Sequence, residues 1–64
     1  MRETVQIHDV IAIKETEAAL LVEIEGEEFW IPKSQIDDDS EVYEENTEGT
    51  LIIPLWFAEK LGIA

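Results

Sequence analysis

Residues 20–32, LLVEIEGEEFWIP, form the stretch that decides the fold. From Leu20 to Ile24 every second residue is aliphatic, which is the periodicity of a half-buried strand. The pattern pauses at Gly26, which adopts the positive φ of a tight turn at no steric cost, and apolar residues then resume up to Pro32. We therefore expect a β-hairpin that turns at Gly26 and whose second strand ends at Pro32.

The chain before this hairpin predicts another strand. Apolar residues recur at even spacing from Val5 to Ile13, and only Asp9 departs from the pattern. We expect a half-buried strand with a β-bulge near Asp9. The residues predicted for its buried face are Val5, Ile7, Ile11 and Ile13.

Short elements are predicted after Pro32. Residues 33–36 are too few for a packed helix and favour a single 3₁₀ turn that returns Ile36 to the core. Residues 37–49 predict an acidic loop, with room for a short strand around Val42.

The C-terminal residues predict a strand followed by a helix. Residues 50–53 are apolar enough for a last strand, and Pro54 stops it while presetting φ for a first helical turn. Residues 55–61 then predict a short helix that Gly62 caps.

Together these elements predict a mostly-β fold of the β-rich α+β class. Their order resembles a small SH3-like or OB-like antiparallel barrel with a short C-terminal helix. A chain of 64 residues has the length of one domain, so residues 1–64 are expected to share a single core. The sequence contains no cysteine, so stability must come from packing or from a partner subunit rather than from disulfides.

The charge balance excludes several classes of ligand. Sixteen acidic residues against four basic ones give a formal net charge of −12. Such a chain repels phosphate backbones and anionic lipid head groups, so we expect no direct binding of nucleic acid or membranes. No stretch approaches the roughly 18 apolar residues of a membrane span, and a cytoplasmic location is expected, in the host cell if the chain is phage-encoded.

Catalytic constellations are absent from the sequence, so we expect a protein that is not an enzyme and uses no cofactor. A nucleophile needs a nearby base, but His8 is the single histidine and is predicted to face solvent from a strand. The acids of residues 37–48 match the ligand spacing of an EF-hand loop, but Val42 occupies the position at which that loop requires glycine. No metal site is therefore predicted.

The acidic residues of the hairpin and of the following loop are candidates for binding a basic partner. The alternative is a purely structural role, in which these acids form a solvated surface and protect a sheet edge from self-pairing. We expect the two groups to share one side of the barrel if the loop folds back. The predicted partner-binding residues are Glu23, Glu25, Glu27, Glu28, Asp37, Asp38, Asp39, Glu41, Glu44, Glu45 and Trp30.

The two tryptophans have two interpretations. In a protein of this size Trp30 and Trp56 are expected to be core residues, whereas an exposed tryptophan beside acids would be a binding anchor. Trp30 lies between Phe29 and Ile31, so both faces of that strand are apolar. One face could then bind a partner or form a homodimer.

Two stretches resemble known sequences. Residues 27–36, EEFWIPKSQI, and residues 51–60, LIIPLWFAEK, resemble small acidic proteins of phages and other mobile elements, over about the C-terminal two-thirds of the chain. The stretch that continues to Gly62 and Ile63 is also similar to AbrB-type DNA-binding domains, but the basic residues of that family are missing. In size and acidity the chain resembles the DNA-mimicking inhibitors of phages, including anti-CRISPR proteins.

These resemblances and the charge lead to two expected functions. The first is an inhibitor that mimics DNA and blocks the nucleic-acid channel of a basic host defence protein, such as a CRISPR surveillance complex. The second is a non-enzymatic accessory module of phage replication or recombination that docks on a protein through Trp30 and the apolar sheet face.

Overall fold

The computed structural model describes residues 3–64, and four antiparallel strands account for half of them. The predicted mostly-β fold with a short C-terminal helix is confirmed. No helix within residues 3–64 is long and apolar enough to cross a membrane. The elements are β1 (Thr4–Glu15), β2 (Ala19–Ile24), β3 (Glu27–Pro32), the 3₁₀ helix η1 (Lys33–Gln35), β4 (Glu48–Pro54) and α1 (Leu55–Leu61).

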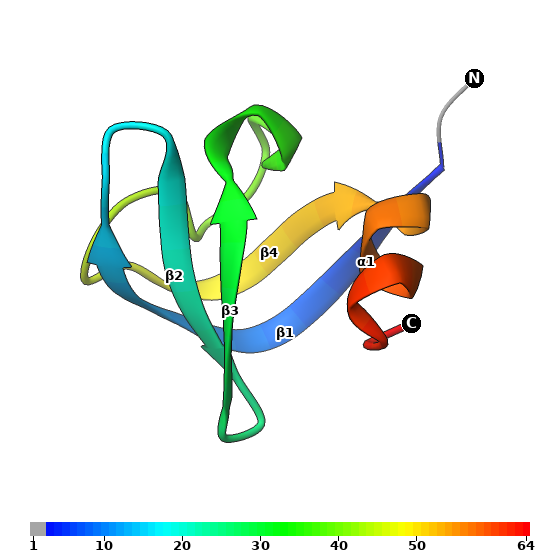
Figure 1. Cartoon of the computed structure of the whole chain (residues 1–64), viewed down its shortest axis with the longest axis horizontal. Helices are drawn as coiled ribbons and strands as arrows, with labels where there is room; N and C mark the ends of the chain where they lie inside the picture. Colours follow the sequence, from blue (N-terminus) through cyan, green and yellow to red (C-terminus); the bar gives the residue numbers. More distant parts are fainter. Residues whose placement is uncertain (1–2) are drawn as a thin grey trace.

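The strands form one curved sheet in the order β3-β2-β1-β4 (Figure 1). The long strand β1 pairs with β2 on one side and with β4 on the other, so it organises the sheet. One face of the sheet packs against α1 and the segment after η1, and we call the opposite face the outer face. The core consists of Val10, Ala12, Leu20, Val22, Ile24, Ile31, Val42, Leu51, Ile53, Phe57 and Ala58.

The hairpin between β2 and β3 forms as predicted. Glu25 and Gly26 have φ angles of 51° and 84°, and positive φ at both central positions is the signature of a type I′ turn. The predicted 3₁₀ turn is also present, and Ile36 packs against the core after it. The local signals of glycine and proline therefore located these elements correctly.

A β-bulge in β1 corrects the predicted buried face of this strand. Opposite β4, the register shifts between Ile7 and Val10, and Asp9 adopts a φ of 60°. The extra residue reverses the alternation, so Val10 points into the core while Ile11 points outward. The bulge near Asp9 is confirmed, but the expectation that Ile11 and Ile13 are buried was wrong: they are 44% and 36% exposed.

The acidic loop, residues 36–47, covers the outer edge of β4. The N–H of Asp37 donates to the Ile52 carbonyl at 2.9 Å, and the N–H of Glu41 donates to the Thr50 carbonyl at 2.8 Å. The buried Ser40 hydroxyl accepts from the Ile52 N–H at 2.9 Å. No strand forms around Val42, whose side chain is instead fully buried in the core.

Helix α1 closes the core beside the ends of β1 and β4 (Figure 1). Pro54 precedes its first residue, and Gly62 ends it with a φ of 82° and an N–H that donates to the carbonyls of Ala58 and Glu59. Phe57 and Ala58 are its buried residues. A fully buried aliphatic or aromatic side chain contributes about 1.5–3 kcal/mol, so this short helix is held by packing rather than by its own propensity.

Candidate partner-binding surface

The outer face of the sheet carries an apolar patch, which consists of the exposed Ile11, Ile13 and Trp30 and the half-buried Leu21. Leu21 of β2 lies directly opposite Trp30 of β3 in the register. Leu21 also lies opposite Lys14 of β1, next to the second bulge of that strand at Ile13. The patch therefore runs across three neighbouring strands, on the face that has no helix over it.

Both tryptophans are exposed, so the expectation that they are core residues was wrong. Trp30 is 48% exposed and Trp56 is 52% exposed. Because Ile24 pairs with Glu27 at the turn, Phe29 and Ile31 share the buried face and Trp30 takes the outer one. Trp56 lies on α1, where its ring meets that of Phe57 edge-on at 5.5 Å.

Acidic residues flank the apolar patch on the same face. Glu23 of β2 lies directly opposite Glu28 of β3, and on its other side it lies opposite Ile11 of β1. Ile11 in turn lies opposite Glu48 of β4. Like charges directly opposite on neighbouring strands destabilise a sheet, so the Glu23–Glu28 pair costs stability unless a cation lies against it.

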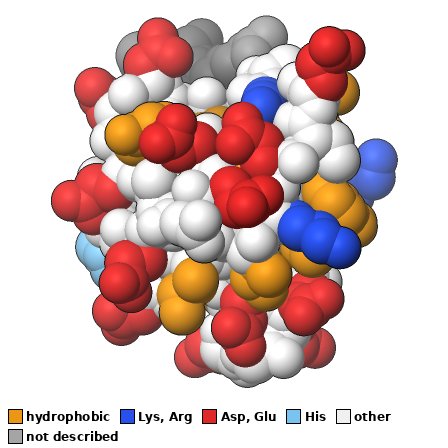
Figure 2. Space-filling view, turned by 90° about the vertical axis from the view of Figure 1, so that its left-hand side faces the viewer, with side chains coloured by type: hydrophobic (Ala, Val, Ile, Leu, Met, Phe, Trp, Pro, Cys, Tyr) orange, Lys and Arg blue, Asp and Glu red, His pale blue; other side chains and the backbone are white. Residues whose placement is uncertain are grey.

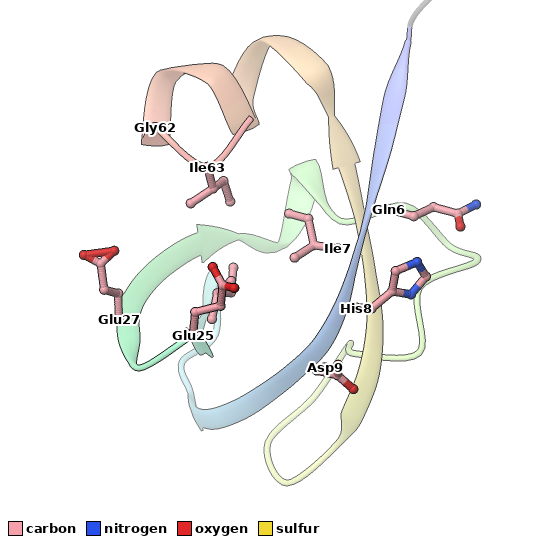
Figure 3. Close-up of a pocket in the computed structure, with 9 residues that line it drawn as sticks. Gln6, Ile7, His8, Asp9, Glu25, Glu27, Gly62 and Ile63 are labelled. Carbon is pink, nitrogen blue, oxygen red and sulfur yellow. The ribbon is translucent and has the colours of Figure 1, made fainter.

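The hairpin acids Glu25 and Glu27 lie at the turn, beside an open cleft of about 590 Å³. Asp9 and Ile63 also line this cleft (Figure 3). Polar side chains do not converge there, because His8 and Gln6 point away from Glu25 and Ile63 in Figure 3. As predicted, His8 is exposed, and its Nδ1 lies 3.0 Å from the Thr50 hydroxyl.

Several of the loop acids have structural roles. Oδ1 of Asp37 accepts the N–H of Asp39 at 2.9 Å, which tightens the turn after η1. Oε1 of Glu41 accepts the N–H of Thr50 at 2.8 Å. These carboxylates are committed to the protein's own backbone, and neither role was predicted from the sequence. The bond of Asp37 to Asp39 is a local Asx turn, whereas Thr50 lies nine residues from Glu41 and no local pattern links the two.

Glu15 joins the acidic loop to η1. Its Oε1 accepts the N–H of Glu45 at 3.2 Å, and Oε1 of Glu45 accepts the N–H of Glu15 at 3.2 Å. Its Oε2 pairs with Lys33 Nζ at 2.5 Å. The bond to Lys33 and the bond to the Glu45 N–H hold the pKa of Glu15 below its usual value of 4.5.

The acids do not gather into one row. Glu25 and Glu27 lie at the turn end of β3, whereas Asp37 and Asp38 lie at its other end beside Lys33. Figure 2 shows one side of the molecule with acidic side chains spread over it and apolar side chains between them. The expected common side for the hairpin and loop acids is therefore not formed.

Three of the four residues of the apolar patch were not predicted from the sequence as binding residues. Trp30 was among the predicted binding residues, but Ile11, Ile13 and Leu21 were not. The signal for Ile11 was the bulge at Asp9, which reverses the face of the residues that follow it up to the second bulge at Ile13. Within residues 3–64 no group of three His, Cys, Asp or Glu side chains could hold a metal ion. Searches of family models, curated proteins and solved structures found no match to this chain.

Proposed function

We propose that this protein is a non-enzymatic protein-binding module that docks on a basic partner through the outer face of its sheet. The observation that carries this proposal is the exposed Trp30, which sits in the apolar patch on the same strand as Glu28. Aromatic residues dominate the energetics of protein interfaces when a partner desolvates them. The resemblance to mobile-element proteins favours a partner from phage replication or recombination.

The charge of the surface defines the partner. Glu23 and Glu28 face each other beside Trp30, and Glu48 lies on the same face two strands away from Glu23. A partner with lysine or arginine around an apolar centre would relieve this repulsion and match the patch. A second copy of the chain fits poorly, because each copy has a net charge of −12.

DNA mimicry is the second candidate, and a different observation favours it. Sixteen carboxylates lie on a molecule whose longest extent is 30 Å. The resulting charge per unit length is comparable to that of duplex DNA, which carries one charge per about 1.7 Å. Within residues 3–64, Lys33 and Glu15 form the one ion pair, so nearly all of this charge is uncompensated. The hairpin acids and the loop acids lie at opposite ends of β3 rather than in one row, which is why we rank mimicry second.

A capture experiment with two variants separates the candidates. Proteins retained from a host lysate by the wild-type chain are compared with those retained by Trp30→Ala and by a charge variant, at low and high salt. The charge variant replaces Asp38, Asp39, Glu44 and Glu48 with their amides, because within residues 3–64 these side chains accept no hydrogen bond.

Docking predicts that Trp30→Ala loses the partner and that the charge variant keeps it in high salt. A hot-spot tryptophan contributes at least about 2 kcal/mol, or about 30-fold in affinity. Mimicry predicts the reverse, since each exposed acid contributes only about 0.2–1 kcal/mol and the acids act together. A partner that Trp30→Ala retains in full but the charge variant loses would refute docking.

A further inference from the structure

The two edge strands of the sheet, β3 and β4, differ in whether their outer sides are covered. The outer edge of β4 is covered, because Ser40 and Glu41 of the acidic loop hydrogen-bond with Ile52 and Thr50. Strand β3 is the other edge strand of the sheet, and no segment within residues 3–64 pairs along its outer side. In Figure 1 β3 lies at the front of the molecule with no strand beside its free edge.

The register identifies which backbone groups of β3 are free. Residues opposite each other in an antiparallel pair alternate between hydrogen-bonded and non-hydrogen-bonded positions. The N–H of Lys33 donates to the Ala18 carbonyl at 2.9 Å, which fixes the phase of this alternation. Glu28 and Trp30 therefore occupy non-hydrogen-bonded positions, and their N–H and C=O groups point away from β2.

These free groups have no other partner in the described chain. Within residues 3–64 no hydrogen bond outside the β2–β3 ladder involves the backbone of Glu28 or Trp30. Both residues are exposed, so these donors and acceptors are open to solvent. The free edge thus coincides with the residue whose side chain anchors the apolar patch. An edge of this kind is a template for the backbone of another chain.

We propose that β3 accepts an extended basic segment of the partner as a fifth strand of the sheet. This inference rests on the proposed docking function and specifies how docking occurs. Main-chain hydrogen bonds to Glu28 and Trp30 supply affinity that depends little on sequence, while alternate side chains of the added strand supply specificity. Those side chains lie on the outer face, beside Trp30 and Glu28.

Side-chain chemistry defines the added strand. A residue beside Trp30 should be apolar, and a residue beside Glu28 should be lysine or arginine, because it would also lie near Glu23. Pairing of two copies through β3 would instead bring Glu27 and Glu28 of one copy against acids of the other. The acids of this edge therefore oppose self-pairing and favour a basic strand.

The test uses a short synthetic peptide in which every second residue, on the face that would lie beside Trp30 and Glu28, is in turn valine and lysine, and a peptide with glutamate in place of lysine is the charge control. Amide hydrogen exchange is followed by NMR on the full chain. Without peptide, the amides of Glu28 and Trp30 should exchange at least about tenfold faster than those of Phe29 and Ile31, since only the latter are in the ladder. Saturating lysine and valine peptide should slow Glu28 and Trp30 by at least about tenfold.

A pair of variants isolates the backbone donor. Glu28→Pro removes both the charge and the outward N–H, whereas Glu28→Gln removes the charge alone. Proline is tolerated in an edge strand where its N–H would face solvent, and circular dichroism with the NMR spectrum checks that the variant is folded. We expect Glu28→Pro to bind the peptide about tenfold more weakly than Glu28→Gln.

The outcomes that overturn strand addition are distinct from those that overturn docking. Suppose that the peptide changes the NMR chemical shifts of the Ile11 and Ile13 methyl groups while the amides of Glu28 and Trp30 still exchange rapidly. That result would refute strand addition and leave docking intact. Equal binding by Glu28→Pro and Glu28→Gln, or no binding at millimolar peptide, would also refute strand addition. Shifts confined to the acidic loop would count against both.

Discussion

The backbone N–H of Thr50 donates a hydrogen bond of 2.8 Å to the carboxylate of Glu41, so a side chain of the acidic loop covers the outer edge of β4. Gly49 makes room for this carboxylate, because a Cβ at position 49 would collide with Oε1 of Glu41. Gly49 also has a φ of 136°, which side-chain-bearing residues rarely adopt. One acid of the loop is thus fixed by a glycine in the neighbouring strand.

Gly49→Ala should destabilise the protein by about 2–4 kcal/mol, the sum of backbone strain and the displaced Glu41 bond. Gly26→Ala is the matched control, because Gly26 has a φ of 84° but no atom lies within 4 Å of the position that its Cβ would take. It should lose only the strain, about 1–2 kcal/mol. Urea denaturation of both variants measures the difference, and equal losses would show that the Glu41 contact does not matter.

Ser40→Ala should cost about 1–3 kcal/mol, because it leaves the Ile52 N–H without its 2.9 Å partner in a part-buried position. Ser34 is exposed and its hydroxyl makes no hydrogen bond within residues 3–64, so Ser34→Ala should change stability by less than about 0.5 kcal/mol. Thermal melts compare the two. A Ser40→Ala protein as stable as Ser34→Ala would contradict the described edge.

The C-terminal and hairpin elements could be read from the sequence because their signals are local. Gly26, Pro54 and Gly62 each mark a boundary through their own backbone preferences. The buried face of β1 was predicted incorrectly beyond Asp9, because the bulge there turns Ile11 to the outer face and the simple alternation does not include this reversal. Alternation counted along β3 from the turn at Gly26 would have placed Trp30 on the outer face of the sheet.

The acidic loop marks the limit of sequence reasoning. Its residues are polar without a period, and the bonds from Ser40 and Glu41 to β4 join residues nine to twelve positions apart. Nothing in the local pattern distinguishes Glu41, whose carboxylate binds backbone, from Glu44, whose side chain extends into solvent. Charge alone therefore predicted a binding surface where part of the loop is structural.

Lys33→Met should raise the pKa of Glu15 toward 4.5, since the bond to Lys33 is the main cause of its lowered value. A lowered pKa in the folded state means that the pair stabilises the protein above pH 4.5 and that this contribution is lost as pH falls through the folded pKa. NMR titration of the Glu15 carboxyl gives the pKa directly. An unchanged titration in Lys33→Met would assign the shift to the Glu45 N–H instead.

Sodium chloride should raise the melting temperature. A net charge of −12 destabilises the compact state through self-repulsion, and salt shortens the screening length from about 10 Å at 0.1 M to about 3 Å at 1 M. Each 1 kcal/mol of repulsion removed should raise Tm by about 4–8 °C. The charge variant defined above should show a smaller rise. A melting temperature that falls with salt would mean that attractive pairs outweigh repulsion.

The most direct test of docking through the outer face compares the two exposed tryptophans. Trp30→Ala and Trp56→Ala remove side chains of nearly equal exposure, 48% and 52%, but only Trp30 lies in the apolar patch. Isothermal titration with the captured partner should show a Kd at least about 30-fold higher for Trp30→Ala and a nearly unchanged Kd for Trp56→Ala. Equal affinities for Trp30→Ala and the wild-type chain would contradict docking through this face.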